Sequence, residues 1–398
     1  MVSTCRSLVV AAALGTLFAP ASAGAHGALE NHDGLVWCGD TLAASTDGGL
    51  LLVQGAPQRQ VSLPAPARLL RYAPGCRQLA VVAGDRVLVV EPGGATTDLG
   101  PLPQPFSSPR FAGDLKPSIA WAPSGKRFAV AAVAYGAYDD GLLLYDVASR
   151  KVAALSLPAQ VILTGAILLD DDTAIVAAKR LNAGGTNLYR TNVSGHALLS
   201  PTLFSEVAFG ESPPAIVADH VGGGVVQVDP ASGAERSVHA TGHLVAGGLS
   251  QDRAKALLRF DDRGAQPRYE VVPLSGGPGA PLHLSPVGIM DVADLGLAPD
   301  GRFVVRTEPL KVKVALDSVD PKTSPRRLLT AANGSAAHIR VSPSGNEAAL
   351  FVQVGGCTPG APISNAQTYL WMLNLDGPPK PQRVALVSRS RDNCTVEH

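Results

Sequence analysis

Short apolar segments alternate with small polar turns along almost the whole chain. The clearest copies of this unit join two apolar segments through a Pro-Ser-Gly or Pro-Asp-Gly turn, in residues 119–130, 297–305 and 341–350. Proline presets the first central torsion of such a turn, and glycine takes the positive φ that other residues avoid. Because the apolar segments are short and show no helical spacing, the pattern predicts paired β-strands.

The strand–turn–strand unit returns at nearly regular intervals. Four short strands that repeat roughly every 40 to 50 residues are typical of β-propeller blades. We therefore predict an all-β fold, a β-propeller of four-stranded blades over residues 26–387, followed by a C-terminal tail at 388–398. The prediction is eight blades, with seven as the alternative, because the first and fifth units are degenerate. The turns are centred near residues 39, 74, 123, 171, 213, 251, 299 and 343.

The third strand of the unit carries a second recurring phrase, in which a Leu-Tyr or Leu-Trp strand ends in Asp or Asn before a small turn. Tyr145, Tyr189 and Tyr369 occupy equivalent positions of this strand, which predicts that they pack in the core. Together with the Ala/Ser-Pro-Asp/Ser-Gly phrase, this strand resembles the WD-repeat-like propeller repeats of TolB-type periplasmic proteins. The resemblance implies a β-propeller fold and leaves the function open.

The N-terminal residues 1–25 have the layout of a secretory signal peptide. Arg6 precedes an apolar run at residues 8–19, and small residues follow at 21–25. That run is shorter than the roughly 20 residues that span a bilayer, and later apolar runs are interrupted by Gly, Pro or charge. We therefore expect an exported protein, periplasmic or secreted, without a transmembrane segment.

Composition removes further classes of function. The chain has 398 residues with 33 basic and 33 acidic side chains, so its formal net charge is zero. Nucleic-acid binders usually carry a basic surplus, so we expect no nucleic-acid partner. Hydrophobic residues make up 46% and charged residues 17% of the chain, a balance that favours a packed core over disorder.

Four cysteines remain once Cys5 of the signal peptide is set aside. Their even number in an exported chain favours two disulfides over free thiols or a metal site. In a propeller the loops alternate between two faces along each blade. The blade register places Cys38 and Cys76 on one face, and Cys357 and Cys394 on the other. We therefore predict the pairs Cys38–Cys76 and Cys357–Cys394.

The two faces of the predicted propeller differ in loop length. Turns between first and second strands and between third and fourth strands are short and form the short-turn face. Loops between second and third strands and the crossovers between blades are longer and form the long-loop face. Binding residues usually lie on elaborated loops of a rigid scaffold, so we expect the binding surface there. Its candidates are Tyr135, Tyr138, Asp139, Asp140, Arg180, Asp261, Asp262 and Arg263.

The sequence contains no recognised catalytic motif. It has no G-x-S-x-G, H-E-x-x-H, GxGxxG or GxxxxGK pattern, and it predicts no catalytic residue, cofactor or metal ligand set. We therefore predict a non-catalytic binding or scaffolding module whose partner is a protein or a small ligand. The alternative is a lactonase- or glycosidase-like propeller hydrolase or lyase, in which carboxylates such as Asp139 and Asp261 act at the channel mouth with calcium.

Overall fold

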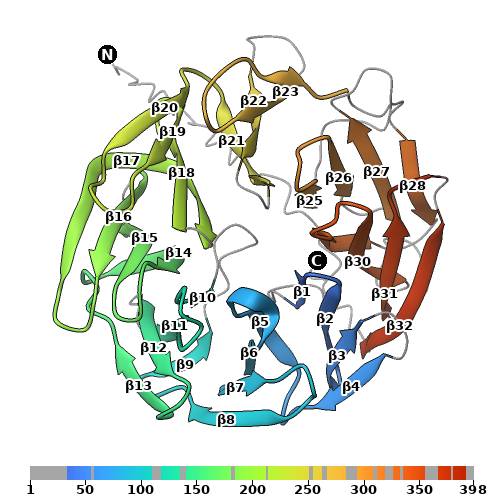
Figure 1. Cartoon of the computed structure of the whole chain (residues 1–398), viewed down its shortest axis with the longest axis horizontal. Coiled ribbons are helices and arrows are strands. Elements are labelled where there is room, and N and C mark those ends of the chain that lie inside the picture. The colour runs from blue at the N-terminus through green and yellow to red at the C-terminus, as the bar shows by residue number, and fades with distance from the viewer. Residues whose placement is uncertain are drawn as a thin grey trace, which may run out of the picture.

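The chain forms a ring of β-sheets in the computed structural model, which Figure 1 shows down the shortest axis of the molecule. The sheets stand side by side around a common centre, as blades do in a β-propeller. The predicted signal peptide, Cys357 and Cys394 lie outside the described residues. The structure describes residues 34–54, 58–109, 118–134, 140–180, 184–211, 214–250, 254–261, 267–283, 294–307, 312–318, 326–331, 335–354, 366–377 and 380–390.

Strands that follow one another in the chain are antiparallel neighbours in each sheet, except that β9 in the third sheet pairs with β11 rather than with β10. The first sheet contains β1 (Leu35–Cys38), β2 (Thr41–Thr46), β3 (Gly49–Val53) and β4 (Arg59–Ser62). The second contains β5 (Ala67–Tyr72), the 3-10 turn η1 (Pro74–Cys76), β6 (Leu79–Ala83), β7 (Arg86–Val90) and β8 (Thr96–Pro101). The third contains β9 (Phe106–Pro109), β10 (Ile119–Trp121), β11 (Arg127–Ala134), β12 (Asp140–Asp146) and β13 (Lys151–Ala154).

The remaining sheets continue around the ring. A seven-stranded sheet contains β14 (Val161–Leu168), β15 (Ala174–Arg180), β16 (Thr186–Thr191), β17 (His196–Glu211), β18 (Pro214–His220), β19 (Val225–Val228) and β20 (Glu235–His239). Three four-stranded sheets follow. They contain β21 (His243–Leu249), β22 (Lys255–Phe260), β23 (Arg268–Pro273) and β24 (Ala280–Pro281); β25 (Asp294–Leu297), β26 (Phe303–Thr307), β27 (Val312–Ser318) and β28 (Arg326–Ala331); and β29 (Ser335–Val341), β30 (Glu347–Val354), β31 (Ala366–Asn374) and β32 (Pro381–Ser390).

The eight predicted turn centres all fall between antiparallel strand partners. They lie between β1 and β2, β5 and β6, β10 and β11, β14 and β15, β17 and β18, β21 and β22, β25 and β26, and β29 and β30. In the Pro-Ser-Gly turn before β11, the amide of Gly125 donates to the carbonyl of Ala122 at 2.9 Å, and Gly125 has a φ of 68°. This is the backbone geometry that the turn residues predict.

Both faces of the sheets are buried, which explains why many strands are continuously apolar. On β2, Leu42 and Ala44 pack against the last sheet, whereas Ala43 between them packs against the second sheet. Successive side chains of a strand point to opposite faces. A strand between two neighbouring sheets therefore needs apolar residues at every position, because neither face meets water.

Tryptophan side chains join the first strands of neighbouring sheets. Trp121 on β10 donates its indole N–H to the carbonyl of Arg71 on β5 at 2.9 Å. Trp37 on β1 donates in the same way to the carbonyl of Arg340 on β29 at 3.1 Å. Because β1 and β29 belong to the first and last sheets, the second bond lies across the closure of the ring.

The recurring tyrosines lie in the interior, as the third-strand pattern predicts. Tyr145 and Tyr189 are buried in apolar clusters between sheets, and Tyr369 is half-buried beneath the guanidinium of Arg383. The acidic run 170–172 stabilises the turn in which it lies, because the carboxylate of Asp170 accepts hydrogen bonds from the backbone N–H groups of Asp172 and Thr173. Within the described ranges, no helix is long and apolar enough to cross a membrane.

Candidate functional site

Three of the predicted binding residues lie in the described part of the chain, all at the long-loop face. Asp140 begins β12, Arg180 ends β15, and Asp261 directly follows β22. Nothing in the structure tests their role in binding, which stays a prediction. The other candidates, namely Tyr135, Tyr138, Asp139, Asp262 and Arg263, lie outside the described residues.

Asp140 forms a hydrogen bond that joins two sheets. Its side chain is buried, and its carboxylate accepts the backbone N–H of Leu163 at 2.6 Å. Leu163 belongs to β14 in the next sheet, so this hydrogen bond joins two sheets. A buried carboxylate needs such donors because it has left water.

Asp261 and Arg180 are exposed on the same face. The carboxylate of Asp261 pairs with the guanidinium of Arg259 at 2.8 Å, and both side chains are about half exposed. An ion pair in water contributes little to stability, so a partner could replace Arg259 at low cost, and the half-exposed carboxylate of Asp261 can be reached. Among the described residues, no group of three or more His, Cys, Asp or Glu side chains is arranged to hold a metal ion.

The sequence did not point to an apolar patch that lies beside Arg180. Leu203 on β17 and Val221 after β18 are 42% and 51% exposed. Both lie against Gly185, where an added Cβ would approach each of them within 3.2 Å. Exposed Lys179 and Arg180 end the neighbouring strand β15. We call this group, Lys179, Arg180, Gly185, Leu203 and Val221, the β17 edge.

Two histidine–carboxylate pairs lie near the β17 edge. The Nδ1 atom of His243 is 3.0 Å from a carboxylate oxygen of buried Asp219, and Nε2 of His220 is 3.0 Å from Glu235. An ionised carboxylate only accepts, so beside one the facing histidine nitrogen has to carry the hydrogen. Burial raises the pKa of Glu235, but hydrogen bonds from Thr202, Ser200 and His220 outweigh it and lower that pKa below its usual value.

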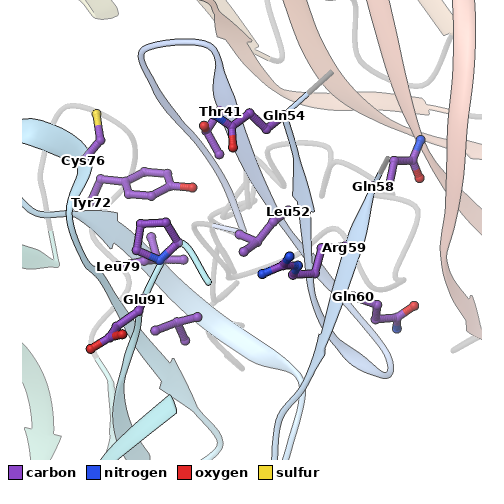
Figure 2. A pocket seen from close by; sticks show the side chains of 12 residues that line it. Thr41, Leu52, Gln54, Gln58, Arg59, Gln60, Tyr72, Cys76, Leu79 and Glu91 are labelled. Carbon is purple, nitrogen blue, oxygen red and sulfur yellow. The ribbon is translucent and has the colours of Figure 1, made fainter. Parts of the chain in front are cut away.

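A cavity of about 470 Å³ opens on the short-turn face, between the first and second sheets (Figure 2). Strands β3 and β4 form one wall, and β5, β6 and the end of β7 form the other. The disulfide Cys38–Cys76 borders it, with 5.6 Å between the two Cα atoms, and this pair is the one that the blade register predicts. The lining residues are Thr41, Leu52, Gln54, Gln58, Arg59, Gln60, Tyr72, Cys76, Leu79, Val90, Glu91 and Pro92.

Two side chains give the cavity its polarity. The hydroxyl of Tyr72 is buried and has no hydrogen-bond partner within the described residues. Burial raises the pKa of Tyr72 to about 12. Arg59 comes from the opposite wall, and its Nη1 donates to the carbonyl of Gly93. Figure 2 shows the hydroxyl of Tyr72 and the guanidinium of Arg59 both directed into the space between the walls.

Sequence comparisons assign the chain to no family, and structural comparisons confirm its fold. No family model matches, and no curated protein is significantly similar. The dihydro-heme d1 dehydrogenase NirN superposes with a TM-score of 0.56 at 12% identity over 88% of this chain and 74% of that one. A prolyl endopeptidase gives 0.53 at 13% identity over 80% and 54%.

TolB from Acinetobacter baumannii is also among the similar structures, with a TM-score of 0.39 at 14% identity over 74% of this chain and 60% of that one. That score is too low for any argument about a TolB-type repeat. At these identities the likeness concerns the fold alone, which is a β-propeller. Enzymes and non-enzymes both occur among the similar structures, so the function has to be argued from the surfaces of this chain.

Proposed function

We propose that this protein is an exported, eight-bladed β-propeller that acts as a non-catalytic binding or scaffolding module through its long-loop face. Export follows from the signal-peptide layout of residues 1–25 and agrees with the disulfide Cys38–Cys76, since such bonds persist in oxidising compartments. The periplasm and the extracellular space both fit.

The packing of the seven-stranded sheet supports eight blades. Strand β17 pairs with β16 up to Phe204, and from Phe204 onward it pairs with β18. Ile175 of β15 and Val226 of β19 share one apolar cluster, although three strands separate them in the hydrogen-bonded order. Side chains so far apart in a sheet meet only if its two halves pack face to face. We therefore count the halves as two blades that share β17.

The observation that carries the proposed function is the β17 edge. Leu203 and Val221 form an exposed apolar pair on a rigid sheet, and two basic residues stand beside them. Apolar side chains within a polar rim are typical of protein interfaces. We propose that this edge, together with the candidate residues of the neighbouring long loops, contacts a protein partner.

Crosslinking tests this proposal. A photo-crosslinking residue at Arg180 should capture a protein partner from the compartment to which the chain is exported, and Val221→Asp should reduce this capture at least tenfold. Val193→Asp is the matched control, because Val193 is 54% exposed in a turn of the short-turn face. Equal capture by both variants, with unchanged melting temperatures, would contradict the proposed surface.

The enzymatic alternative makes a different prediction. A calcium-dependent hydrolase or lyase would use carboxylates of the long-loop face, and calcium would then raise the melting temperature. The two described candidates already accept protein donors, because Asp140 binds the amide of Leu163 and Asp261 pairs with Arg259. These contacts favour the binding role. An unchanged melting temperature in millimolar calcium would support that choice.

A second disulfide, Cys357–Cys394, completes the proposal. It would fasten the C-terminal residues that follow β32 to the last blade, since β32 includes the first three residues, 388–390, of the predicted tail. Peptide mapping without reductant tests this pairing directly. A link from Cys38 to Cys394 would contradict both the pairing and the assignment of these cysteines to opposite faces.

A further inference from the structure

The cavity on the short-turn face has the dimensions of a small-molecule site and lies on the face opposite to the proposed protein-binding surface. Its volume of about 470 Å³ falls within the range of known ligand pockets, roughly 300 to 1,000 Å³. It lies between two sheets that the disulfide Cys38–Cys76 ties together. The walls are therefore held in place before any ligand arrives, which lowers the entropic cost of binding.

The Tyr72 hydroxyl is the polar group of this cavity that has no partner among the described residues. An unpaired buried hydroxyl is costly, so most such groups find a partner in the native state. The described residues supply none, although Gln54 and Thr41 line the same cavity. Since burial raises the pKa of Tyr72 to about 12, the phenol keeps its proton at physiological pH and can donate that hydrogen to an acceptor.

Arg59 adds a positive charge opposite this donor. Its Nη1 donates to the carbonyl of Gly93 across the boundary of the two sheets, which fixes the guanidinium at the mouth of the cavity. A guanidinium has five N–H donors and no acceptor, so it also needs an acceptor-rich partner. Glu91 is the acidic residue in the lining, and Figure 2 shows its carboxylate directed away from Arg59.

The remainder of the lining is suited to an apolar body. Leu52, Leu79 and Val90 are buried at the base of the cavity, and Pro92 adds a further apolar surface. A ligand that lies against these side chains transfers its own apolar surface from water to an apolar wall. The cavity thus combines two converging donors with an apolar base.

We propose that this cavity binds a small organic anion, with its carboxylate between the Tyr72 hydroxyl and the Arg59 guanidinium and its apolar body over Leu52 and Leu79. A carboxylate offers the two acceptor oxygens that these donors require, and its charge matches Arg59. A neutral amide of the same shape offers one acceptor oxygen, and its N–H group cannot pair with the Arg59 guanidinium, which has no acceptor. The site therefore distinguishes acids from their amides.

Ligand-observed NMR titration of the full-length mature protein tests the proposal with three acid–amide pairs: acetate and acetamide, hexanoate and hexanamide, benzoate and benzamide. At least one acid should bind saturably, and its amide should bind roughly tenfold more weakly or not at all, the loss expected when one charge-assisted hydrogen bond is removed. Failure of all three acids to bind, or equal affinity for acid and amide, would overturn the proposal.

Substitutions of the two donor residues test whether the acid binds in this cavity. Tyr72→Phe and Arg59→Gln should each weaken its binding roughly tenfold. Tyr145→Phe is the control for the first variant, because Tyr145 also has a buried hydroxyl without a partner among the described residues but does not line the cavity. Arg68→Gln is the control for the second, since Arg68 is exposed on the same strand as Tyr72. Unchanged affinity in Tyr72→Phe would refute the assignment.

Melting temperatures of the variants separate a loss of ligand binding from a loss of folding. Removal of an unpaired buried hydroxyl should leave the melting temperature of Tyr72→Phe equal to or above that of the wild type. Binding lost by a stable variant is therefore binding lost at the site. The outcome is also independent of the β17 edge, because Val221→Asp should bind the acid normally.

Discussion

At the scale of single residues, short polar side chains close the turns between third and fourth strands. Oδ1 of Asp146 accepts hydrogen bonds from the backbone N–H and the hydroxyl of Ser149, at 2.8 and 2.9 Å. Asn192 makes the same pair of bonds with Ser194, and Asp229 makes them with Ser232. Each side chain replaces a backbone carbonyl in the turn, which explains why Asp or Asn ends the third strand in several units.

The charge of Asp146 makes a pH-dependent contribution to stability. Hydrogen bonds from Ser149, followed by the guanidinium of Arg127, lower the pKa of Asp146 to about 2. This pKa lies below the unfolded value of about 3.9, so the stabilisation is complete above about pH 5 and is lost as the pH falls toward 2. Asn keeps an acceptor for Ser149, as Asn192 shows, but it loses the charge that pairs with Arg127.

We therefore expect Asp146→Asn to lower the free energy of unfolding by about 1 kcal/mol or less at pH 7, because the pair is partly exposed. The difference from the wild type should shrink as the pH falls from about 4 to 2. Urea unfolding at several pH values measures it. A difference that stays constant from pH 7 to pH 2.5 would show that the charge of Asp146 does not contribute.

At the scale of elements, β17 is the strand that the sequence describes least well. It runs without interruption through residues 196–211, although the periodicity predicts a crossover between two blades there. The register with β16 shifts around Leu188, close to Pro201 on β17, which cannot donate to the ladder. The strand thus passes from its pairing with β16 to its pairing with β18 through an irregularity rather than a loop, and the apolar pattern does not predict this.

The turn between β19 and β20 packs tightly on β17. Gly233 in this turn has a φ of 74°, and a Cβ there would overlap the carbonyl oxygen of Leu199. Gly125 provides a matched control, because its φ is 68° and a Cβ there would meet nothing within 4 Å. Both positions strain an alanine backbone to a similar degree, so the difference between them isolates the contact with β17.

We expect Gly125→Ala to cost about 1 kcal/mol and Gly233→Ala to cost about 1 to 3 kcal/mol more, the range for overpacking. Chemical denaturation of both variants measures these costs. Hydrogen exchange should also increase in β17 and β20 of Gly233→Ala alone. Equal costs would mean that the turn moves away from β17 without penalty.

At the scale of the whole molecule, the sequence predicts the repeat but not the cavity between the first and second sheets. Each blade is specified locally by its turns and apolar runs, such as the Pro-Ser-Gly turn that ends at Gly125. The cavity instead depends on Leu52, Arg59, Tyr72 and Val90, which come from four strands of two sheets. Tyr72 lies directly before a weak copy of the repeat turn, so its position in the sequence predicts a core residue rather than a cavity-lining one. Among the described residues its hydroxyl has no partner, and this depends on how the two sheets pack.

Closure of the ring is likewise a property of the whole chain. The first and last sheets are joined by apolar side-chain contacts, by the bond from Trp37 to Arg340, and by the backbone N–H of Asp47, which donates to the carbonyl of Val387 at 2.9 Å. Leu42 and Leu51 of the first sheet share an apolar cluster with Phe351 and Leu370 of the last. Trp37 and Arg340 are 303 positions apart in the sequence, so this contact is non-local and closes a long loop of the chain.

Substitution of Phe351 tests how much the contact between the first and last sheets stabilises the ring. Phe351 is fully buried between the terminal sheets, and Phe351→Ala should cost about 3 to 5 kcal/mol. Phe128→Ala makes the same change between the second and third sheets, because Phe128 is also fully buried. Suppose that the contact between the first and last sheets is less stable than the contact between the second and third sheets. Hydrogen exchange in Phe351→Ala then rises in β1–β4 and β29–β32 together. In Phe128→Ala it rises only near β5–β13. A uniform rise around the ring in both variants would show that the propeller opens as one cooperative unit.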